Sequence, residues 1–443
     1  MAHIVPIYLH VRLGFHRSIR RDAGEESRPS SALFLNHNLR ERGTYFRNFH
    51  LARVLAERGW NTTILTVSPR RTLRPSVDMV RGVRVIQTPQ FLTPHRFAAS
   101  GFCPIDSLYR CLRMGIERFD VVFVSDHLPN VSAPFFAAKL MHPRSVFVAD
   151  WADLFTDGGV HEHWNTLLAQ PVYRASRFLE RGLKGWADLC TATSRPLLRI
   201  LQDQIGVDSW RTLHLPSGCD LKTAFPASML AARNQLGLPA DALIVGRTCS
   251  SDRITPTEMQ AMLALADRYR ALTGREALIY LIGPCDPKKY PKLFAGNCQV
   301  RFTGKLKPEQ VPVHLAACDL FLLIEDDEVN CRFRGPIRLN DYLAAGRPVV
   351  CNSIGDHVVT LTAHEACVVA DDFAAPNAVL DVVLTNAVDR DAMGRRARAL
   401  AEGRLCWDNL GRKLESLILQ YIAVLHHETA PIPAHHTVLG AAR

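Results

Sequence analysis

CDLFLLIEDDEVNCRFRGPIRLNDYLAAGRPVVCN, residues 318–352, is the stretch that decides the fold. Short apolar runs at 319–324 and 347–351 have the length and composition of strands buried in a parallel sheet. The segment between them predicts a helix, because Pro336 suits a first helical position and Gly346 suits a C-terminal cap. Such a unit points the free N–H groups of the helix N-terminus beyond the end of the first strand. A phosphate or a ribose fits there.

The segment PIRLNDYLAAGRPVV, residues 336–350, resembles the P-x-K-L-x-E-Y-x-A-x-G-x-P-V signature of retaining GT-B glycosyltransferases of the family 4 type. The similarity is closest to the branch that builds bacterial surface polysaccharides. It implies that Asp341 holds the ribose hydroxyls of a nucleotide-sugar donor, since two carboxylate oxygens can accept from two vicinal hydroxyls. It also places Arg338 with the donor. The chain departs from the pattern at Asp341, where glutamate is usual, and at Phe333, where other branches have a second glutamate.

Length and composition bound the class of protein. A chain of 443 residues exceeds what one hydrophobic core usually organises, which predicts two domains of about 200 residues each. With 47% apolar and 22% charged residues, the composition is that of a soluble globular protein. No apolar run approaches the ~18 residues of a membrane span, and Arg12 interrupts the opening apolar run too early for a signal peptide. We therefore expect a cytoplasmic protein.

The formal net charge of +10 fits three kinds of partner: nucleic acid, an anionic membrane surface or phosphate-bearing substrates. No zinc finger, helix-turn-helix or aromatic RNP pattern accompanies the charge, so we expect no nucleic-acid partner. We expect peripheral contact with the inner face of a membrane that carries a lipid-linked acceptor. A solvated basic surface is the plainer explanation of much of the charge.

Strand–helix alternation predicts an α/β fold in several segments. They are an N-terminal extension (1–30), a Rossmann-like acceptor domain (31–216), a linker rich in Pro, Ala and Gly (217–240), a Rossmann-like nucleotide-sugar domain (241–405), a C-terminal helix (406–425) expected to pack back on the first domain, and a tail (426–443). The resemblance implies a GT-B architecture, in which the two doubly wound domains face each other across a cleft.

Candidate residues of the first domain follow its strands, because ligands of open α/β sheets collect beyond the carboxyl ends of strands. Gly43 and Thr44 lie where family members place a glycine loop against the donor phosphates, although a plain helix start explains the pair equally well. The resemblance suggests His127 and Asp153 as catalytic residues after two further strands, although Ser125 occupies the aligned histidine position. A loop cap or turn is the structural alternative for each.

Candidate residues of the second domain match two family strings in part. Arg247 and Arg253 follow its first strand, and the resemblance implies that these two cations grip the donor diphosphate, which guanidinium groups can do bidentately. Gly304, Lys305 and Leu306 resemble a loop whose backbone meets the base of the donor. Each residue alone is an ordinary surface position, and the order and spacing carry the argument.

Other chemistries find little support. The only D-x-D string, at 389–391, begins a basic helix, where aspartate is a cap. H-E-x-x-H, P-loop and G-x-S-x-G motifs are absent from the sequence, and its twelve cysteines include no C-x-x-C pair. The acidic run at 325–328 predicts a solvated loop rather than a cation site. We expect no metal and no cofactor besides the donor substrate.

The sequence therefore predicts transfer of a hexosyl group from a UDP- or GDP-linked sugar to a glycan, lipid-linked or small-molecule acceptor, with retention of anomeric configuration. In this hypothesis Arg247 and Arg253 neutralise the leaving diphosphate and Asp341 fixes the ribose. The alternative is a catalytically inactive GT-B-like protein that serves as a binding or assembly partner of another transferase. The residues at 125, 333 and 341 favour that alternative.

Overall fold

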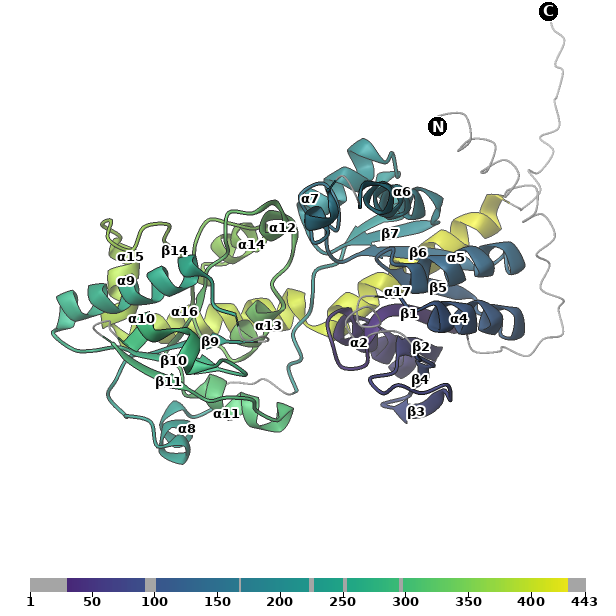
Figure 1. Cartoon of the computed structure of the whole chain (residues 1–443). Helices are drawn as coiled ribbons and strands as arrows, with labels where there is room; N and C mark the ends of the chain where they lie inside the picture. Colours follow the sequence, from purple (N-terminus) through teal and green to yellow (C-terminus); the bar gives the residue numbers. More distant parts are fainter. Residues whose placement is uncertain are drawn as a thin grey trace, which may run out of the picture.

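The computed structural model of the protein describes residues 30–91, 101–166, 169–222, 227–249, 253–294 and 298–428. The predicted extension before residue 30 and the tail after residue 428 lie outside these residues. The described chain forms two lobes, each built on one sheet (Figure 1). The strand order is β3-β4-β2-β1-β5-β6-β7-β8 in the first sheet and β11-β10-β9-β12-β13-β14 in the second. The expected α/β class with two Rossmann-like units is confirmed.

The first lobe alternates strands and helices. Its strands are β1 (Ser31–Leu39), β2 (Asn61–Val67), β3 (Ser76–Val80), β4 (Val83–Thr88), β5 (Val121–Ser125), β6 (Val146–Trp151), β7 (Leu189–Ala192) and β8 (Thr212–His214). Its helices are α2 (Thr44–Glu57), α4 (Pro104–Ile116), α5 (Pro129–Met141), α6 (Gln170–Trp186) and α7 (Arg195–Arg199), which continues into a π-helical turn at Ile200–Gln204. Neighbouring strands pair in parallel except β3 and β4, which pair antiparallel.

The second lobe repeats the scheme with parallel pairs throughout its sheet. Its strands are β9 (Ile244–Thr248), β10 (Leu278–Ile282), β11 (Gln299–Phe302), β12 (Leu320–Leu323), β13 (Val349–Cys351) and β14 (Cys367–Val369). Its helices are α8 (Met229–Leu236), α9 (Pro256–Thr273), α10 (Pro291–Phe294), α11 (Val311–Ala316), α12 (Val329–Phe333), α13 (Ile337–Ala344), α14 (His357–Ala363), α15 (Ala378–Thr385) and α16 (Ala387–Leu400).

Chain direction and strand order place a switch point in each sheet. The order runs outward from β1 to β4 on one side and from β5 onward on the other, so the switch lies between β1 and β5. In the second sheet it lies between β9 and β12. Ligands of open α/β sheets bind in the crevice that forms at such points, beyond the carboxyl ends of the strands. Each lobe therefore offers one predicted ligand crevice.

The stretch at 318–352 folds as expected in its main features. Strand β12 pairs in parallel with β13, and the ring of Tyr342 on α13 stacks on Phe321 at a centroid distance of 4.0 Å. The helix begins one residue later than expected, because the extended ψ of 113° makes Pro336 the cap rather than the first helical residue. The short helix α12 was not predicted; it occupies part of the expected charged loop.

The C-terminal helix, far from the first lobe in sequence, completes that lobe. The chain leaves the second lobe after α16, crosses through a π-helical turn (Ala401–Leu405) and returns to the first lobe as α17 (Trp407–Glu428), drawn in yellow in Figure 1. Leu410 and Leu414 of α17 share one apolar core with Leu51 of α2. Gly411 permits the close approach, since a Cβ there would lie 2.5 Å from a methyl carbon of Val54.

Two predicted boundaries need correction. Helix α17 extends to Glu428 and not to 425. The expected linker at 217–240 contains α8, a helix with Ser228 as its N-cap and Gly237 in the left-handed conformation as its C-cap. Among the described residues, none of the helices is both long and apolar enough to span a membrane.

Candidate functional site

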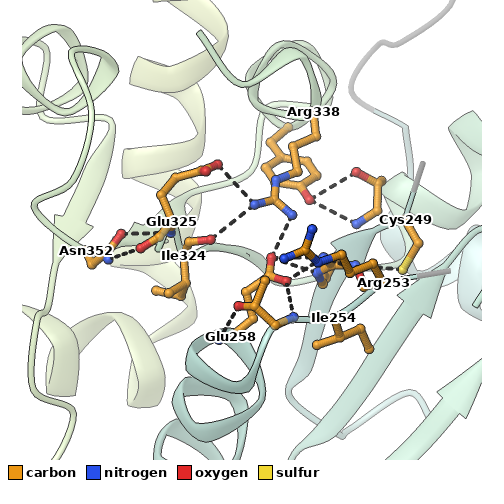
Figure 2. Close-up of polar contacts among 12 residues, drawn as sticks. Cys249, Arg253, Ile254, Glu258, Ile324, Glu325, Arg338 and Asn352 are labelled. Atoms are coloured by element: carbon orange, nitrogen blue, oxygen red, sulfur yellow. Dashed lines mark hydrogen bonds and ion pairs between the residues drawn. The ribbon is translucent and has the colours of Figure 1, made fainter. Parts of the chain in front are cut away.

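The candidate site of the second lobe lies at its switch point, where β9 and β12 end. Arg247 is on β9, Glu258 is in the first turn of α9, and Arg338 is in the first turn of α13. Figure 2 shows Arg338 between Glu258 and Glu325, with the backbone of Arg253 beside Glu258. Guanidinium and carboxylate groups thus come together from positions up to 91 residues apart in sequence.

Arg247 is held almost entirely by Glu258. Its NH2 group donates to both Glu258 carboxylate oxygens at 2.9 and 2.7 Å, and its Nε donates to one of them at 3.1 Å. NH2 also donates to the carbonyl oxygen of Arg253 at 3.1 Å. Burial lowers the pKa of Arg247, but the carboxylate of Glu258 outweighs burial and raises it. Arg247 therefore stays charged, and its donors are already engaged in the protein.

Arg338 joins two carboxylates that belong to different elements. It donates to Glu258 at 2.8 Å and to Glu325 at 3.1 Å. Glu325, which follows β12, is only 2% exposed and also forms an ion pair with Arg334. Burial raises the pKa of Glu325, but Arg334 and Arg338 together lower it below its ordinary value. The prediction of a solvated loop at 325–328 is therefore wrong for Glu325, while Asp327 and Glu328 are exposed.

Asp341 lies on the same helix as Arg338, three residues on. It is half-buried, and no hydrogen bond to its carboxylate is among the contacts of the described residues. Burial, and to a smaller extent the charge of Asp220, raise the pKa of Asp341 to about 7. The charge of the carboxyl group therefore changes near neutral pH, and its contact with ribose hydroxyls stays a prediction.

The remaining predicted residues of the second lobe lie on loops. The side chain of Arg253 is exposed in the loop between β9 and α9. Gly304 follows β11 with a positive φ of 70° and pairs with Gly283 in an isolated bridge. Lys305 is exposed, and Leu306 packs against the core of the lobe. The structure brings Arg247, Arg338 and the backbone of Arg253 together at Glu258, whereas Gly304, Lys305 and Leu306 form a separate loop.

In the first lobe, Gly43 and Thr44 form a well-fixed helix start. Gly43 has a φ of 52°, and a Cβ there would lie 2.5 Å from Nδ2 of Asn38. The hydroxyl of Thr44 donates to Oδ1 of Asn36 at 2.9 Å and accepts from Asn38 at 3.0 Å. Both residues thus fix the local structure at the start of α2, and their contact with donor phosphates stays a prediction.

His127 is buried at the switch point of the first lobe and is 2% exposed. Its Nε2 lies 2.8 Å from the hydroxyl of Ser176, and its ring contacts Phe155 edge to face. Burial, with Lys184 nearby, lowers the pKa of His127 well below its ordinary value, so the ring is neutral at physiological pH. A neutral imidazole here can exchange hydrogen bonds but carries no charge.

Two buried residues beside His127, Asp126 and His37, were not predicted from the sequence. Asp126 has a φ of 62°, and its Oδ2 lies 3.5 Å from Nδ1 of His37, which is on β1. Burial raises the pKa of Asp126 well above its ordinary value and lowers that of His37 to about 3. The position of Asp126 directly after a strand was the signal available in the sequence, since it is the same signal that pointed to His127.

Asp153, after β6, faces the other lobe. Burial raises the pKa of its carboxyl group, and the positive charge that opposes this shift most is that of Arg334 in the second lobe. The lobes also meet where the Ser194 hydroxyl donates to the carbonyl oxygen of Phe333 at 2.6 Å. Asp153 is therefore a cleft residue. In the described part of the chain, no group of His, Cys, Asp and Glu side chains is arranged to hold a metal ion.

Comparison with known proteins finds two glycosyltransferase family models that match this chain. The model described as Glycosyltransferase Family 4 matches residues 47–223, and Glycosyl transferases group 1 matches residues 243–385. D-inositol 3-phosphate glycosyltransferase of Geodermatophilus obscurus is 27% identical over 277 residues, which are 59% of this chain and 58% of that protein. The chain spans little more than half the length of the curated relatives it matches.

Solved structures share the fold at low sequence identity. Sucrose-phosphate synthase of Thermosynechococcus elongatus superimposes with a TM-score of 0.65 and 17% identity, covering 90% of this chain and all of that one. HepE of Anabaena, in complex with UDP and glucose, gives a TM-score of 0.58 and 16% identity over 88% of this chain and all of that one. The two lobes and their order along the chain are thus a known arrangement.

Proposed function

This chain belongs to the GT-B glycosyltransferases of the family 4 type, and from that premise we propose that it transfers a hexosyl group from a nucleotide sugar to an acceptor. The observation that carries the proposal is the charge at the second switch point. Three guanidinium groups, of Arg247, Arg334 and Arg338, share the carboxylates of Glu258 and Glu325. One positive charge remains over, and Arg253 adds a second in the adjoining loop. A diphosphate matches this surplus.

The donor is proposed to be UDP- or GDP-linked. HepE, which shares the fold, was solved with UDP and glucose, and this supports a nucleoside diphosphate in the crevice beyond β9 and β12. Asp341 is proposed to accept from the ribose hydroxyls, since its half-buried carboxylate lies on α13, three residues after Arg338.

Arg247 would have to exchange partners to contact the diphosphate. Glu258 retains Arg338 at 2.8 Å, so the carboxylate keeps a cation when Arg247 turns to the donor. Such an exchange leaves no buried charge unpaired, which would otherwise be costly. The internal pairing of Arg247 is therefore compatible with donor binding.

The proposed chemistry retains the configuration of the sugar. The bond between C1 of the sugar and the diphosphate oxygen breaks, and an oxocarbenium-like centre forms beside the leaving diphosphate. The acceptor hydroxyl oxygen bonds to C1 on the same face, and its proton passes to the diphosphate. Arginine cations stabilise the negative charge that develops on the leaving group, a contribution of several kcal/mol in a water-poor cleft. No divalent metal is needed for these steps.

The acceptor is proposed to be a glycan, a lipid-linked sugar or a small molecule, bound by the first lobe in the cytoplasm or at the inner face of a membrane. Peripheral membrane contact is supported by helix α4, on which Leu108, Leu112 and Ile116 are 61, 60 and 77% exposed at a spacing of four residues. Leu140 of the adjoining helix α5 is 84% exposed. Arg118 is exposed next to this apolar stripe, and a basic rim suits an anionic lipid surface.

Incubation with a panel of nucleotide sugars tests the proposal, because many transferases release nucleoside diphosphate slowly without an acceptor. Release from one donor and not from the others is expected. The second candidate is a catalytically inactive binding or assembly partner, favoured by Phe333 in place of a glutamate and by the internal pairing of Arg247. Binding of a nucleoside diphosphate with no release from any donor, even with acceptor extracts, would support that candidate.

A further inference from the structure

A cavity of about 150 Å³ lies at the hinge between the lobes. Its lining comes from the start of α7 in the first lobe, from α13 and the start of α14 in the second, and from the crossing that leads to α17. Figure 1 shows α7 facing α12 and α14 across this junction. The cavity shares Arg334 with the proposed donor site but is not lined by Arg247, Arg253 or Asp341. The cavity therefore borders the proposed donor site at Arg334 and is otherwise lined by other residues.

The lining of the cavity is strongly cationic. Arg195, Arg334, Arg404 and Lys413 are the cations of the lining, and Asp356 is the one carboxylate among the lining residues. Arg334 is already paired with Glu325, which lies outside the lining. Asp356 is already engaged, since it accepts from the backbone N–H of Arg195 at 3.0 Å and from its guanidinium at 3.2 Å. Arg404 and Lys413 are exposed at the mouth and have no ion pair or hydrogen bond within the described chain. An excess of positive charge therefore faces the cavity.

Two buried groups in the lining lack hydrogen-bond partners. Asn340 is 6% exposed, and its amide Nδ2 has no acceptor among the described residues. The ring nitrogens of His357 are both buried without a partner in the same part of the chain. Burial lowers the pKa of His357 to about 4, so the ring is neutral at pH 7 and offers one N–H donor. Buried donors without acceptors are rare, and a ligand with acceptor oxygens would satisfy both.

We propose that the hinge cavity binds a small phosphate dianion, held by Asn340 and His357 on one side and by Arg404 and Lys413 at the mouth. The volume is below the roughly 300–1,000 Å³ of sites for larger organic ligands, so the cavity suits a phosphate-sized group rather than a whole nucleotide sugar. Phosphate oxygens accept several hydrogen bonds and carry the charge that the lining requires.

The proposed ligand would connect the two lobes. Arg195 belongs to the first lobe, and Asn340 and His357 belong to the second. Arg404 lies on the turn that crosses between the lobes, and Lys413 lies on α17, which packs on the first lobe. A dianion bound to all of them would stabilise this arrangement of the lobes over a more open one. The site thus goes beyond the proposed transfer reaction and does not depend on it.

Calorimetric titration of the full chain with inorganic phosphate near neutral pH and at low salt tests the proposal. Saturable one-site binding is expected. The double variant Arg404→Ala/Lys413→Ala should weaken it by about tenfold or more, since two charge-assisted contacts are lost. Arg412→Ala is the matched control, because Arg412 is on the same helix as Lys413 but is absent from the lining. It donates to the backbone carbonyl of Asp408 and to the side chain of Asn409. The Arg412→Ala variant should leave phosphate binding unchanged.

The source of the phosphate group is tested with glucose 6-phosphate. Tighter binding than that of inorganic phosphate would assign the site to a phosphorylated acceptor or product, and equal affinity would assign it to free phosphate. Asn340→Asp, which puts a carboxylate in the cavity, should abolish binding of both probes while circular dichroism shows an intact fold. Absence of saturable binding, or equal loss in Arg412→Ala, overturns the proposal. Titration of the double variant with UDP separates the two sites, because its affinity for UDP should equal that of the unmodified protein.

Discussion

Arg247 and Glu258, eleven residues apart in sequence, are joined by three hydrogen bonds that close the β9–α9 connection beneath the candidate donor site. Glu258 is also the third residue of α9 and completes a capping box with Thr255. A single carboxylate therefore caps a helix, holds one arginine of the site and contacts a second. Removing it or its partner should therefore affect folding and, if the proposed donor site is correct, donor binding as well.

Arg253→Ala should reduce donor turnover by about a hundredfold or more, because one preplaced cation at the leaving diphosphate is lost. The side chain of Arg253 is exposed, so the fold should be unaffected. Nucleoside diphosphate release measures the effect. Arg395→Ala, which removes an exposed charge elsewhere in the same lobe, is the control. Turnover within a few-fold of the unmodified protein would exclude Arg253 from the site.

Glu258→Ala should destabilise the second lobe by about 3–5 kcal/mol, since it leaves the buried guanidinium of Arg247 without its carboxylate. Urea unfolding gives the change in free energy. The exposed pair of Arg270 and Glu276, 3.7 Å apart, provides a comparison, and Glu276→Ala should cost less than about 1 kcal/mol. Equal effects of the two substitutions would contradict the structural role given to Glu258.

Donor affinity should depend on pH through Asp341, whose pKa is raised to about 7. The carboxylate form is the one proposed to accept hydrogen bonds from ribose, and it predominates above this pKa. The KM for the nucleotide sugar should therefore rise by about tenfold between about pH 8 and about pH 6, as the ionised fraction falls. The KM of Asp341→Asn should be nearly flat over this interval. A pH dependence that survives the substitution would assign the titration to another group.

Treatment with EDTA should leave transfer unchanged, since arginines are proposed to supply the positive charge that a divalent cation supplies in metal-dependent transferases. The rate of donor hydrolysis before and after dialysis against the chelator is the measurement. Loss of activity that returns on addition of Mg²⁺ or Mn²⁺ would show that the proposed chemistry lacks a component.

The apolar stripe on α4 should mediate binding to anionic vesicles. Replacing Leu108, Leu112 and Ile116 by Ser should weaken co-sedimentation by about tenfold or more, because each apolar side chain contributes roughly 1.5–3 kcal/mol when fully buried. Val379→Ser/Val382→Ser removes exposed apolar surface from the second lobe and serves as the control. Equal vesicle binding by both variants would rule out this face as the contact.

Much of the fold follows from local sequence pattern. The runs at 319–324 and 347–351, which form β12 and β13, are short and apolar, and each was placed within about two residues, as such patterns allow. Helix α12 was missed because five residues of polar and mixed character carry no periodicity. Helix α8 was missed because the composition of its surroundings resembles that of a linker, although Ser228 and Gly237 mark its two ends.

The site was less accessible from the sequence because its pairing is long-range. Arg247 and Arg338 were named from a family resemblance, but their common partner Glu258 is a capping residue in any local analysis. The burial of Glu325 depends on Arg334 and Arg338, which approach it only when α12 and α13 fold over the end of β12. A run of four acidic residues gives no indication of which one faces inward.

The crossings between the lobes have a consequence for how this chain can be divided. The backbone N–H of Cys219 donates to the carbonyl oxygen of Leu405 at 2.6 Å, and Cys219 and Cys406 form a parallel bridge. The segment that leaves the first lobe and the segment that returns to it therefore lie side by side. The second lobe is topologically an insertion into the first. Excising it and joining the two bridged positions would preserve a complete first lobe, whereas ending the chain at the outgoing crossing would strip that lobe of α17 and expose the apolar face of α2.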